Sequence, residues 1–415
     1  MKQKKNIVKP LIAFIFMVML LLLPLTQNNS AGNNNNSSEN LTYKAISSEP
    51  SILSTTSSAN ISEEKIDNII KNMTLKEKIG QLFIVTPTHL ETGSIRTQDN
   101  ITEISDNQIL TLSKYPVGGI IFFDTNINDG KTLKKYITDL QNNSSIPLFI
   151  SVDEEGGSVT RLSDKPETEV DELPFMQTLG EINDPKKTYS LSKNLGTQLN
   201  SLGFNLDFAP VADINSNPNN PVIGNRSFGD TPEIVSKMIP EVIKGLQSSN
   251  VSACLKHFPG HGDTSDDTHD GRVTLDVERE RLDSLELIPF SAGIKSDVDF
   301  VMVSHISLPK ITNDDMPATF SKEIVTDILR SDLNFEKIII TDALDMQAIT
   351  SYYSSEETAV NCINAGIDII LMPEQLDEAF AAIEKAINDK TINESVIDKS
   401  LRRIIKVKLE RNIIK

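Results

Sequence analysis

The chain has 415 residues, of which 38% are hydrophobic and 24% are charged, and its formal net charge is −18. A surface this acidic repels nucleic acid, and no basic cluster compensates for it, so we predict no nucleic-acid partner. The two cysteines, Cys254 and Cys362, are too few for a disulfide framework, and we predict that both are buried free thiols.

The N-terminal region has the composition of an export signal. Residues 1–31 combine a lysine-rich start, an apolar run from Leu11 to Leu23 and small residues near position 30. We predict export to the extracellular space, the cell wall or the outer face of the cytoplasmic membrane. An uncleaved N-terminal anchor, and hence membrane association, is the alternative, although the apolar run is short for a span of about 20 residues. Residues 32–61 are rich in asparagine and serine and predict a flexible linker.

From residue 62 onward, short apolar segments alternate with longer segments of helical periodicity. Eight of the apolar segments predict β-strands, at residues 81–85, 117–123, 147–153, 204–213, 251–258, 299–306, 337–343 and 368–373. Near-continuous apolar strands alternating with helices indicate a parallel sheet covered by helices, and eight such units close a (β/α)8 barrel. An open doubly wound sheet is the alternative, but no glycine-rich phosphate fingerprint follows the first strand. We predict one α/β TIM-type barrel domain over residues 62–415, acting as a monomer.

Charged side chains follow five of the predicted strands. They lie in residues 153–161, in residues 213–229, in residues 256–272, at His305 and at Asp342. In a parallel barrel the functional face is formed by the loops at the carboxyl ends of the strands. We therefore expect these residues to meet in one polar ligand site.

The segment "KHFPGHGDTSDDTHDGR", residues 256–272, contains three of the five histidines of the chain. His257 and His261 have the spacing of a zinc-binding helix, but Pro259 and Gly260 between them disfavour a helix, and no glutamate follows the first histidine. No G-K-[ST] sequence follows the glycines, so a phosphate loop is also disfavoured. We predict neither a bound metal nor a cofactor.

An acid/base pair is the remaining interpretation of this segment. In an extended loop residues i and i+2 point the same way, so the Asp267 carboxylate can hold one ring nitrogen of His269 while the other nitrogen serves a substrate. From the tripeptide alone, a solvated loop histidine with no catalytic role is an equally good interpretation. Asp342, delivered by an apolar strand, is a candidate nucleophile, and Asp345 is the poorer competitor. A carboxylate nucleophile with a proton donor is the equipment for glycoside cleavage with retention.

Together these motifs resemble glycoside hydrolase family 3, and specifically its β-N-acetylglucosaminidase (NagZ-like) branch. The resemblance covers nearly all of residues 62 to 411. It rests on the segments "MTLKEKIGQLF", "VDEEGGSVTRL", "NRSFG", "KHFPGHGDTSDDTH", "TDALDM" and "AGIDIILMP".

The resemblance implies an exo-acting, retaining β-N-acetylglucosaminidase that removes terminal GlcNAc from peptidoglycan fragments such as muropeptides, or from related glycans. It implies that Asp342 is the nucleophile and that Asp267 and His269 form the acid/base dyad, with His269 transferring the proton. Residues matching those that hold the sugar are Asp153, Arg161, Arg226, Lys256 and His257. We expect His261, Asp213 and His305 to support the site from behind.

The sequence departs from the branch at two places. Thr268 stands where serine is usual, which should leave the dyad intact, and Ala343 follows the nucleophile where aspartate is more common. The functional alternatives are a phosphorylase, because a histidine does not repel an incoming phosphate, and a β-glucosidase or β-xylosidase. A non-catalytic wall-binding module is the alternative from another class, and the presence of nucleophile, dyad and sugar-holding residues together argues against it.

Overall fold

The computed structural model describes residues 62–94, 100–269 and 271–415. The predicted signal segment, residues 1–31, and the predicted linker, residues 32–61, lie outside the described residues. Within the described part of the chain, none of the helices has both the length and the apolar composition that crossing a membrane requires.

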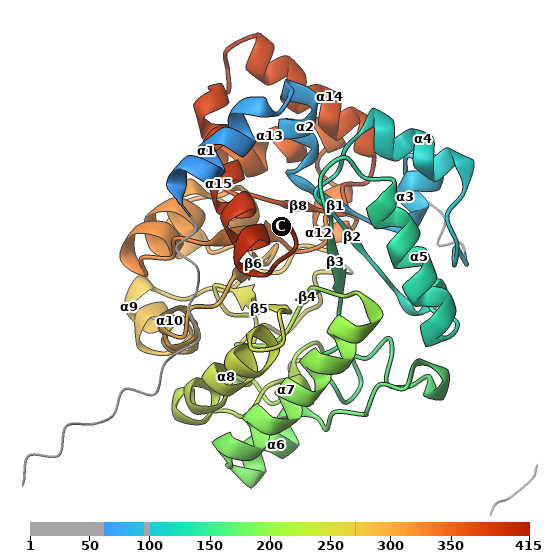
Figure 1. The fold of residues 1–415 in the computed structure, drawn as a ribbon. Coiled ribbons are helices and arrows are strands. Elements are labelled where there is room, and N and C mark those ends of the chain that lie inside the picture. Colours follow the sequence, from blue (N-terminus) through green and yellow to red (C-terminus); the bar gives the residue numbers. More distant parts are fainter. Residues whose placement is uncertain (1–61, 95–99, 270) are drawn as a thin grey trace, which may run out of the picture. The chain divides into compact units, whose positions relative to one another are not determined.

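Eight short parallel strands form a single sheet in the order β7-β6-β5-β4-β3-β2-β1-β8. The strands are β1 Phe83–Val85, β2 Gly119–Ile121, β3 Phe149–Val152, β4 Leu206–Asp207, β5 Ser252–Phe258, β6 Phe300–Val303, β7 Ile338–Thr341 and β8 Ile370–Leu371. A parallel bridge between Ile340 and Ile369 joins the two ends of this order. The strands lie at the centre of the domain with helices around them (Figure 1), which confirms the predicted (β/α)8 barrel.

Each observed strand is shorter than the apolar segment that predicted it. The segment 204–213 keeps only Leu206–Asp207 as a strand. Pro210 has no N–H to donate to a ladder, and beyond it only Val211 forms an isolated parallel bridge, with Lys256. The chain after β4 therefore leaves the sheet early and becomes available to build the carboxyl end of the barrel.

Helices cover the outside of the barrel (Figure 1). They are α1 Glu63–Asn72, α2 Leu75–Gly80, α3 Pro87–Thr92, α4 Asp106–Lys114, α5 Gly130–Asn142, α6 Met176–Ile182, α7 Pro185–Leu202, α8 Pro232–Gln247, α9 Arg279–Ser284, α10 Leu287–Lys295, α11 Pro309–Thr312, η5 Glu323–Asp332, α12 Gln347–Thr350, α13 Ser355–Ala365, α14 Leu376–Asn388 and α15 Glu394–Glu410. Local sequence sets their ends, as in α7, where the Asp184 side chain caps the first turn and Gly203 ends the helix at φ 108°.

The amino end of the barrel is closed by the C-terminal helix α15. The buried Lys408 ammonium donates to Gln81 Oε1 and to the carbonyls of Gly118 and Pro147, which precede β1, β2 and β3. Burial lowers the pKa of Lys408 to about 7. Polar groups at this end thus have a structural role, which leaves the opposite end for a ligand. Both cysteines are buried free thiols, as expected.

Candidate active site

A cavity of about 240 Å³ lies at the carboxyl ends of the strands. Seven of the eight predicted site residues line it: Asp153, Arg161, Arg226, Lys256, His257, His269 and Asp342. The eighth, Asp267, contacts His269 from outside the lining. The structure therefore brings together residues that are spread over nearly 200 positions of the sequence.

Asp342 follows the last residue of β7, and the ladder to β6 fixes its backbone, because its N–H donates to the Val303 carbonyl at 2.8 Å. One carboxylate oxygen accepts the N–H of Ala343 at 2.8 Å. Burial alone would raise the pKa of Asp342, but the nearby imidazoles of His257 and His305, with this N–H, outweigh burial and hold the pKa below its usual range. The carboxylate is thus ionised at neutral pH.

His305 supports the nucleophile segment through the backbone of Ala343. Its Nε2 donates to the Ala343 carbonyl at 2.9 Å, and its Nδ1 lies 2.6 Å from the Thr319 hydroxyl. Burial lowers the pKa of His305, which favours the neutral ring. Ala343 therefore contacts Asp342 through its N–H and His305 through its carbonyl, and it is one of the residues that line the cavity.

Asp345, the competing carboxylate, is not among the residues that line the cavity. Burial, followed by the charge of Asp342, raises the pKa of Asp345 to about 6. A carboxyl group that is hard to ionise is a poor nucleophile, so position and charge both favour Asp342.

The predicted dyad forms as a local pair on the loop after β5. Asp267 Oδ1 accepts from the backbone N–H of His269 at 2.9 Å and from its Nδ1 at 2.7 Å. Burial works to raise the pKa of Asp267, but these two bonds and the imidazole charge lower it overall. Because Nδ1 donates to the carboxylate, Nε2 of His269 is left for a substrate at the rim of the cavity.

A buried carboxylate that the sequence analysis did not single out organises the floor of the cavity. Glu155 lies 2.6 Å from the Lys256 ammonium and binds Arg226 with both oxygens, at 2.7 and 2.9 Å. Burial would raise the pKa of Glu155, but these two cations hold it well below the usual range. Lys256 also lies 2.6 Å from Asp153. The four charges form one network that fixes three predicted sugar-holding side chains.

The signal for Glu155 was present in the sequence. The segment "DEEGG" places two further charges beside one predicted sugar contact, and a buried lysine and arginine require a counter-charge. Its partners lie 71 and 101 positions later, however, so only the fold shows which glutamate meets them.

The neighbouring Glu154 turns the other way and holds the loop after β3. Its carboxylate accepts the backbone N–H groups of Arg161, Leu162 and Ser163 at 2.8 to 3.2 Å. This clamp fixes the backbone from which the Arg161 side chain reaches the cavity, with its guanidinium 5.7 Å from the centre of the Phe123 ring.

Asp213 has the supporting role expected of it. It accepts from Nδ1 of His257 at 2.7 Å and from the backbone N–H groups of His257 and His261 at 3.1 and 2.6 Å. Its buried carboxylate thus orients the His257 ring with Nδ1 as the donor, and Nε2 lies 3.4 Å from Arg226 Nη2. His261 also lines the cavity, which goes beyond the support that the sequence analysis expected of it.

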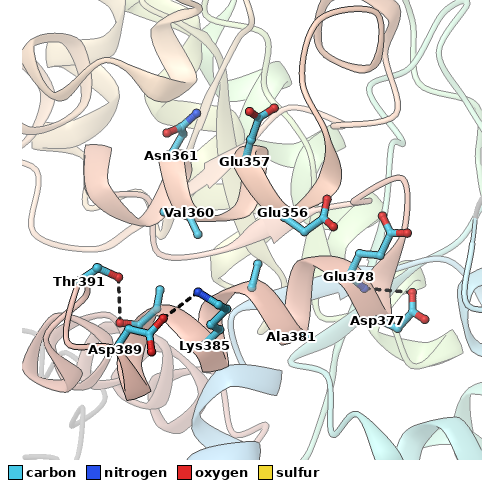
Figure 2. Close-up of a pocket in the computed structure, with 12 residues that line it drawn as sticks. Glu356, Glu357, Val360, Asn361, Asp377, Glu378, Ala381, Lys385, Asp389 and Thr391 are labelled. Atoms are coloured by element: carbon cyan, nitrogen blue, oxygen red, sulfur yellow. Dashed lines mark hydrogen bonds and ion pairs between the residues drawn. The ribbon is translucent and has the colours of Figure 1, made fainter.

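A larger hollow of about 800 Å³ lies elsewhere, on the outer surface between α13 and α14 (Figure 2). Its lining combines Val360 and three alanines with five acidic side chains, Glu356, Glu357, Asp377, Glu378 and Asp389. Lys385, the one basic side chain of the lining, is paired with Asp389 (Figure 2). None of the predicted site residues lies there. Within residues 62–94, 100–269 and 271–415, no group of three or more histidine, cysteine, aspartate or glutamate side chains is arranged to hold a metal ion.

Comparisons with known proteins agree with this geometry. Residues 74–407 match the family model for the glycosyl hydrolase family 3 N terminal domain. Beta-hexosaminidase A of Pseudoalteromonas piscicida is 34% identical over 323 residues, which are 72% of this chain and 54% of that protein. Beta-hexosaminidase of Nitrosomonas eutropha is 34% identical over 297 residues, which are 68% of this chain and 82% of that protein.

A solved structure is also similar to this chain. A glycoside hydrolase family 3 beta-N-acetylglucosaminidase from Paenibacillus sp. str. FPU-7 has a TM-score of 0.76 and 37% identity, over 82% of this chain and 63% of that chain. The matched part of this chain thus spans about half of the first curated relative and less than two thirds of this structure.

Proposed function

Because the chain belongs to glycosyl hydrolase family 3, we propose that it is a retaining exo-β-N-acetylglucosaminidase that releases terminal GlcNAc. The observation that carries the proposal is the convergence of an ionised carboxylate, Asp342, and a carboxylate-bound histidine, His269, in one cavity. The names of the relatives, beta-hexosaminidase and beta-N-acetylglucosaminidase, support an N-acetylhexosamine as the sugar.

In the first step the Asp342 carboxylate forms a bond to the anomeric carbon as the bond from that carbon to the leaving oxygen breaks. Protonated His269 gives its Nε2 proton to the leaving oxygen and becomes neutral. The low pKa of Asp342 keeps the nucleophile ionised, and the bond from Nδ1 to Asp267 stabilises the imidazolium before transfer.

In the second step neutral His269 removes a proton from water, and the water oxygen bonds to the anomeric carbon. The bond from that carbon to Asp342 breaks, which returns the carboxylate. Two displacements, each with inversion, retain the configuration, and His269 ends protonated and ready for the next cycle.

The charge network on the cavity floor is suited to hold the sugar hydroxyls. Lys256 and Arg226 supply N–H donors, and Asp153 supplies carboxylate acceptors. Because Glu155 binds both cations, they are fixed before substrate arrives and lose little freedom on binding.

We further propose that the protein is exported and acts on peptidoglycan-derived glycans, including muropeptides. The export pattern of residues 1–31 supports this location, and an uncleaved leader would keep the enzyme at the membrane surface. We also propose a monomer as the active unit.

Turnover of aryl β-GlcNAc against aryl β-glucoside by the purified protein tests the proposal. We expect a preference for the GlcNAc substrate of at least about 100-fold in kcat/KM, since a site built to bind a polar substituent rejects the analogue without it. Equal turnover of the glucoside would favour a β-glucosidase, and phosphate-dependent formation of a sugar phosphate would favour a phosphorylase.

A further inference from the structure

The loop that carries His269 is held by the segment that follows the nucleophile. On the near side of His269, the buried Thr268 accepts the N–H of Ala348 in α12 at 3.2 Å. On the far side, the Arg272 guanidinium carbon lies 3.9 Å from the centre of the Tyr352 ring. The two contacts are four residues apart on the loop and four residues apart on the partner segment.

The tyrosine side of this contact is well anchored. The backbone N–H groups of Tyr352 and Tyr353 both donate to the Ile349 carbonyl, at 2.9 and 3.0 Å. The Tyr353 ring packs edge-on against Phe320 at 5.0 Å, and its hydroxyl lies 3.5 Å from Arg272 Nη2. Arg272 therefore rests on a surface that the barrel rim holds in place.

Arg272 differs from the other described arginines in its partners. Each of the others has a carboxylate within 4.0 Å. None of the carboxylates in the described residues lies that close to Arg272, whose recorded contacts are the two tyrosines. Within the described residues Arg272 is thus held by stacking on tyrosine and by the Tyr353 hydroxyl, although the chain has a net charge of −18.

The chain beyond Arg272 is also fixed. Ser307, after β6, donates to the Val273 carbonyl at 2.8 Å and accepts from Leu275 at 2.9 Å. The exposed His269 side chain thus lies between a fixed point at Thr268 and a fixed point that begins with Arg272.

We propose that Arg272, stacked on Tyr352, is a positioning residue for proton transfer: it fixes the exit of the loop so that His269 stays at the mouth of the cavity that holds Asp342. The inference rests on the proposed function, in which His269 is the acid and base. Arg272 acts on His269 through the loop backbone and does not itself touch the reacting atoms.

Leaving-group dependence separates this role from a general structural one. A phenyl leaving group needs protonation, whereas a 2,4-dinitrophenyl group leaves without it. Loss of the stack should therefore slow the first step for phenyl β-GlcNAc and spare it for the dinitrophenyl substrate. Partial unfolding would lower kcat/KM for both substrates by the same factor.

The experiment measures kcat/KM for both substrates with Arg272→Ala, Tyr352→Ala and Tyr352→Phe. From the strength of an exposed cation–π contact we expect about a twofold to fivefold loss for the phenyl substrate in the two alanine variants, and no measurable loss for the dinitrophenyl substrate. Tyr352→Phe keeps the ring and should behave as wild type. Arg279→Ala, which removes an ion-paired surface arginine of α9, is the matched control and should leave the ratio of the two substrates unchanged.

Two results would overturn the inference while leaving the proposed function intact. One is an equal loss on both substrates. The other is an Arg272→Ala variant with unchanged kcat/KM on both neutral aryl substrates but lowered kcat/KM on a GlcNAc disaccharide whose leaving sugar bears a carboxylate. Arg272 would then bind the leaving group. A wild-type protein inactive on both aryl substrates would instead refute the proposed function itself.

Discussion

Replacing Glu155 with glutamine removes one negative charge from a buried network and leaves the shape of the side chain almost unchanged. In the native protein this carboxylate contacts Lys256 and Arg226 at 2.6 to 2.9 Å, and 1% of its side chain is exposed. Oε1 of Glu155 accepts from both Lys256 and Arg226 Nη2, whereas Oε2 accepts only from Arg226 Nε. A glutamine oxygen can replace Oε1, but its NH₂ group then faces Arg226 Nε, so Arg226 must lose one of its two bonds or turn away.

The expected magnitude follows from these contacts. Removal of one partner from a buried ion pair destabilises a protein by about 3 to 5 kcal/mol. Displacement of two charge-assisted contacts to the sugar, at about 1.5 to 3 kcal/mol each, corresponds to a loss of roughly 10² to 10⁴ in kcat/KM. The variant should thus lose both stability and activity.

The opposite end of the barrel supplies a matched control. Asp299, just before β6, is fully buried and also binds one arginine and one lysine, with Arg411 and Lys337 both at 2.9 Å. Asp299→Asn makes the same chemical change away from the cavity. We expect a similar loss in the free energy of unfolding, with kcat/KM per folded molecule within about twofold of wild type.

The assay combines urea unfolding with kcat/KM for an aryl GlcNAc substrate, corrected for the fraction folded. If Glu155→Gln and Asp299→Asn lowered activity per folded molecule to the same extent, the reasoning would be refuted, because Glu155 would then act only through stability.

Three further predictions concern the site. Asp345→Asn should stabilise the protein by up to about 3 kcal/mol at pH 8, because the pKa of the carboxyl group is raised by about two units and each unit corresponds to 1.36 kcal/mol. The pKa of Asp345 is raised to about 6, so the wild-type protein has its full stability below pH 4 and loses stability as pH rises through 6 and the buried carboxyl group ionises. Urea unfolding should therefore show the difference between variant and wild type vanishing toward pH 4. Gly262→Ala should lower the melting temperature by the equivalent of about 1 to 3 kcal/mol, because a Cβ there would lie 1.7 Å from the Ile214 carbonyl oxygen; an unchanged melting curve would count against it. Asp267→Asn should lower kcat for phenyl β-GlcNAc by roughly 10² to 10³, because His269 loses the carboxylate that accepts from Nδ1 and orients the ring; steady-state rates across pH 5 to 8 would test this.

The barrel was predictable because its signal repeats. Eight apolar segments of strand length each bury a strand, and parallel strands must be separated by helices, so sequence order alone determines the topology. The ends of the strands were not predictable to the same degree. The segment 204–213 is apolar beyond β4 because it lines the barrel rim, and apolar composition does not distinguish a ladder from a buried loop.

The contacts of the site were also predictable only in part. The contact between Asp267 and His269 is local, two residues apart, and could be proposed from the tripeptide. Glu155, Arg226 and Lys256 come from the neighbouring units of β3, β4 and β5 but lie 71 and 101 positions apart in sequence, so charge alone could not assign their pairing before the fold was known.

The covalent intermediate on Asp342 is the central claim, and a fluorinated, slowly hydrolysed N-acetylglucosaminyl substrate with a good leaving group tests it most directly. After incubation and proteolysis, mass spectrometry should find one fluorinated sugar unit on the peptide that contains Asp342, and fragmentation should place it on that residue. A label on Asp345 would contradict the account. So would an enzyme that turns over ordinary substrate rapidly, is inactivated by the fluorinated substrate, and yet yields no labelled peptide.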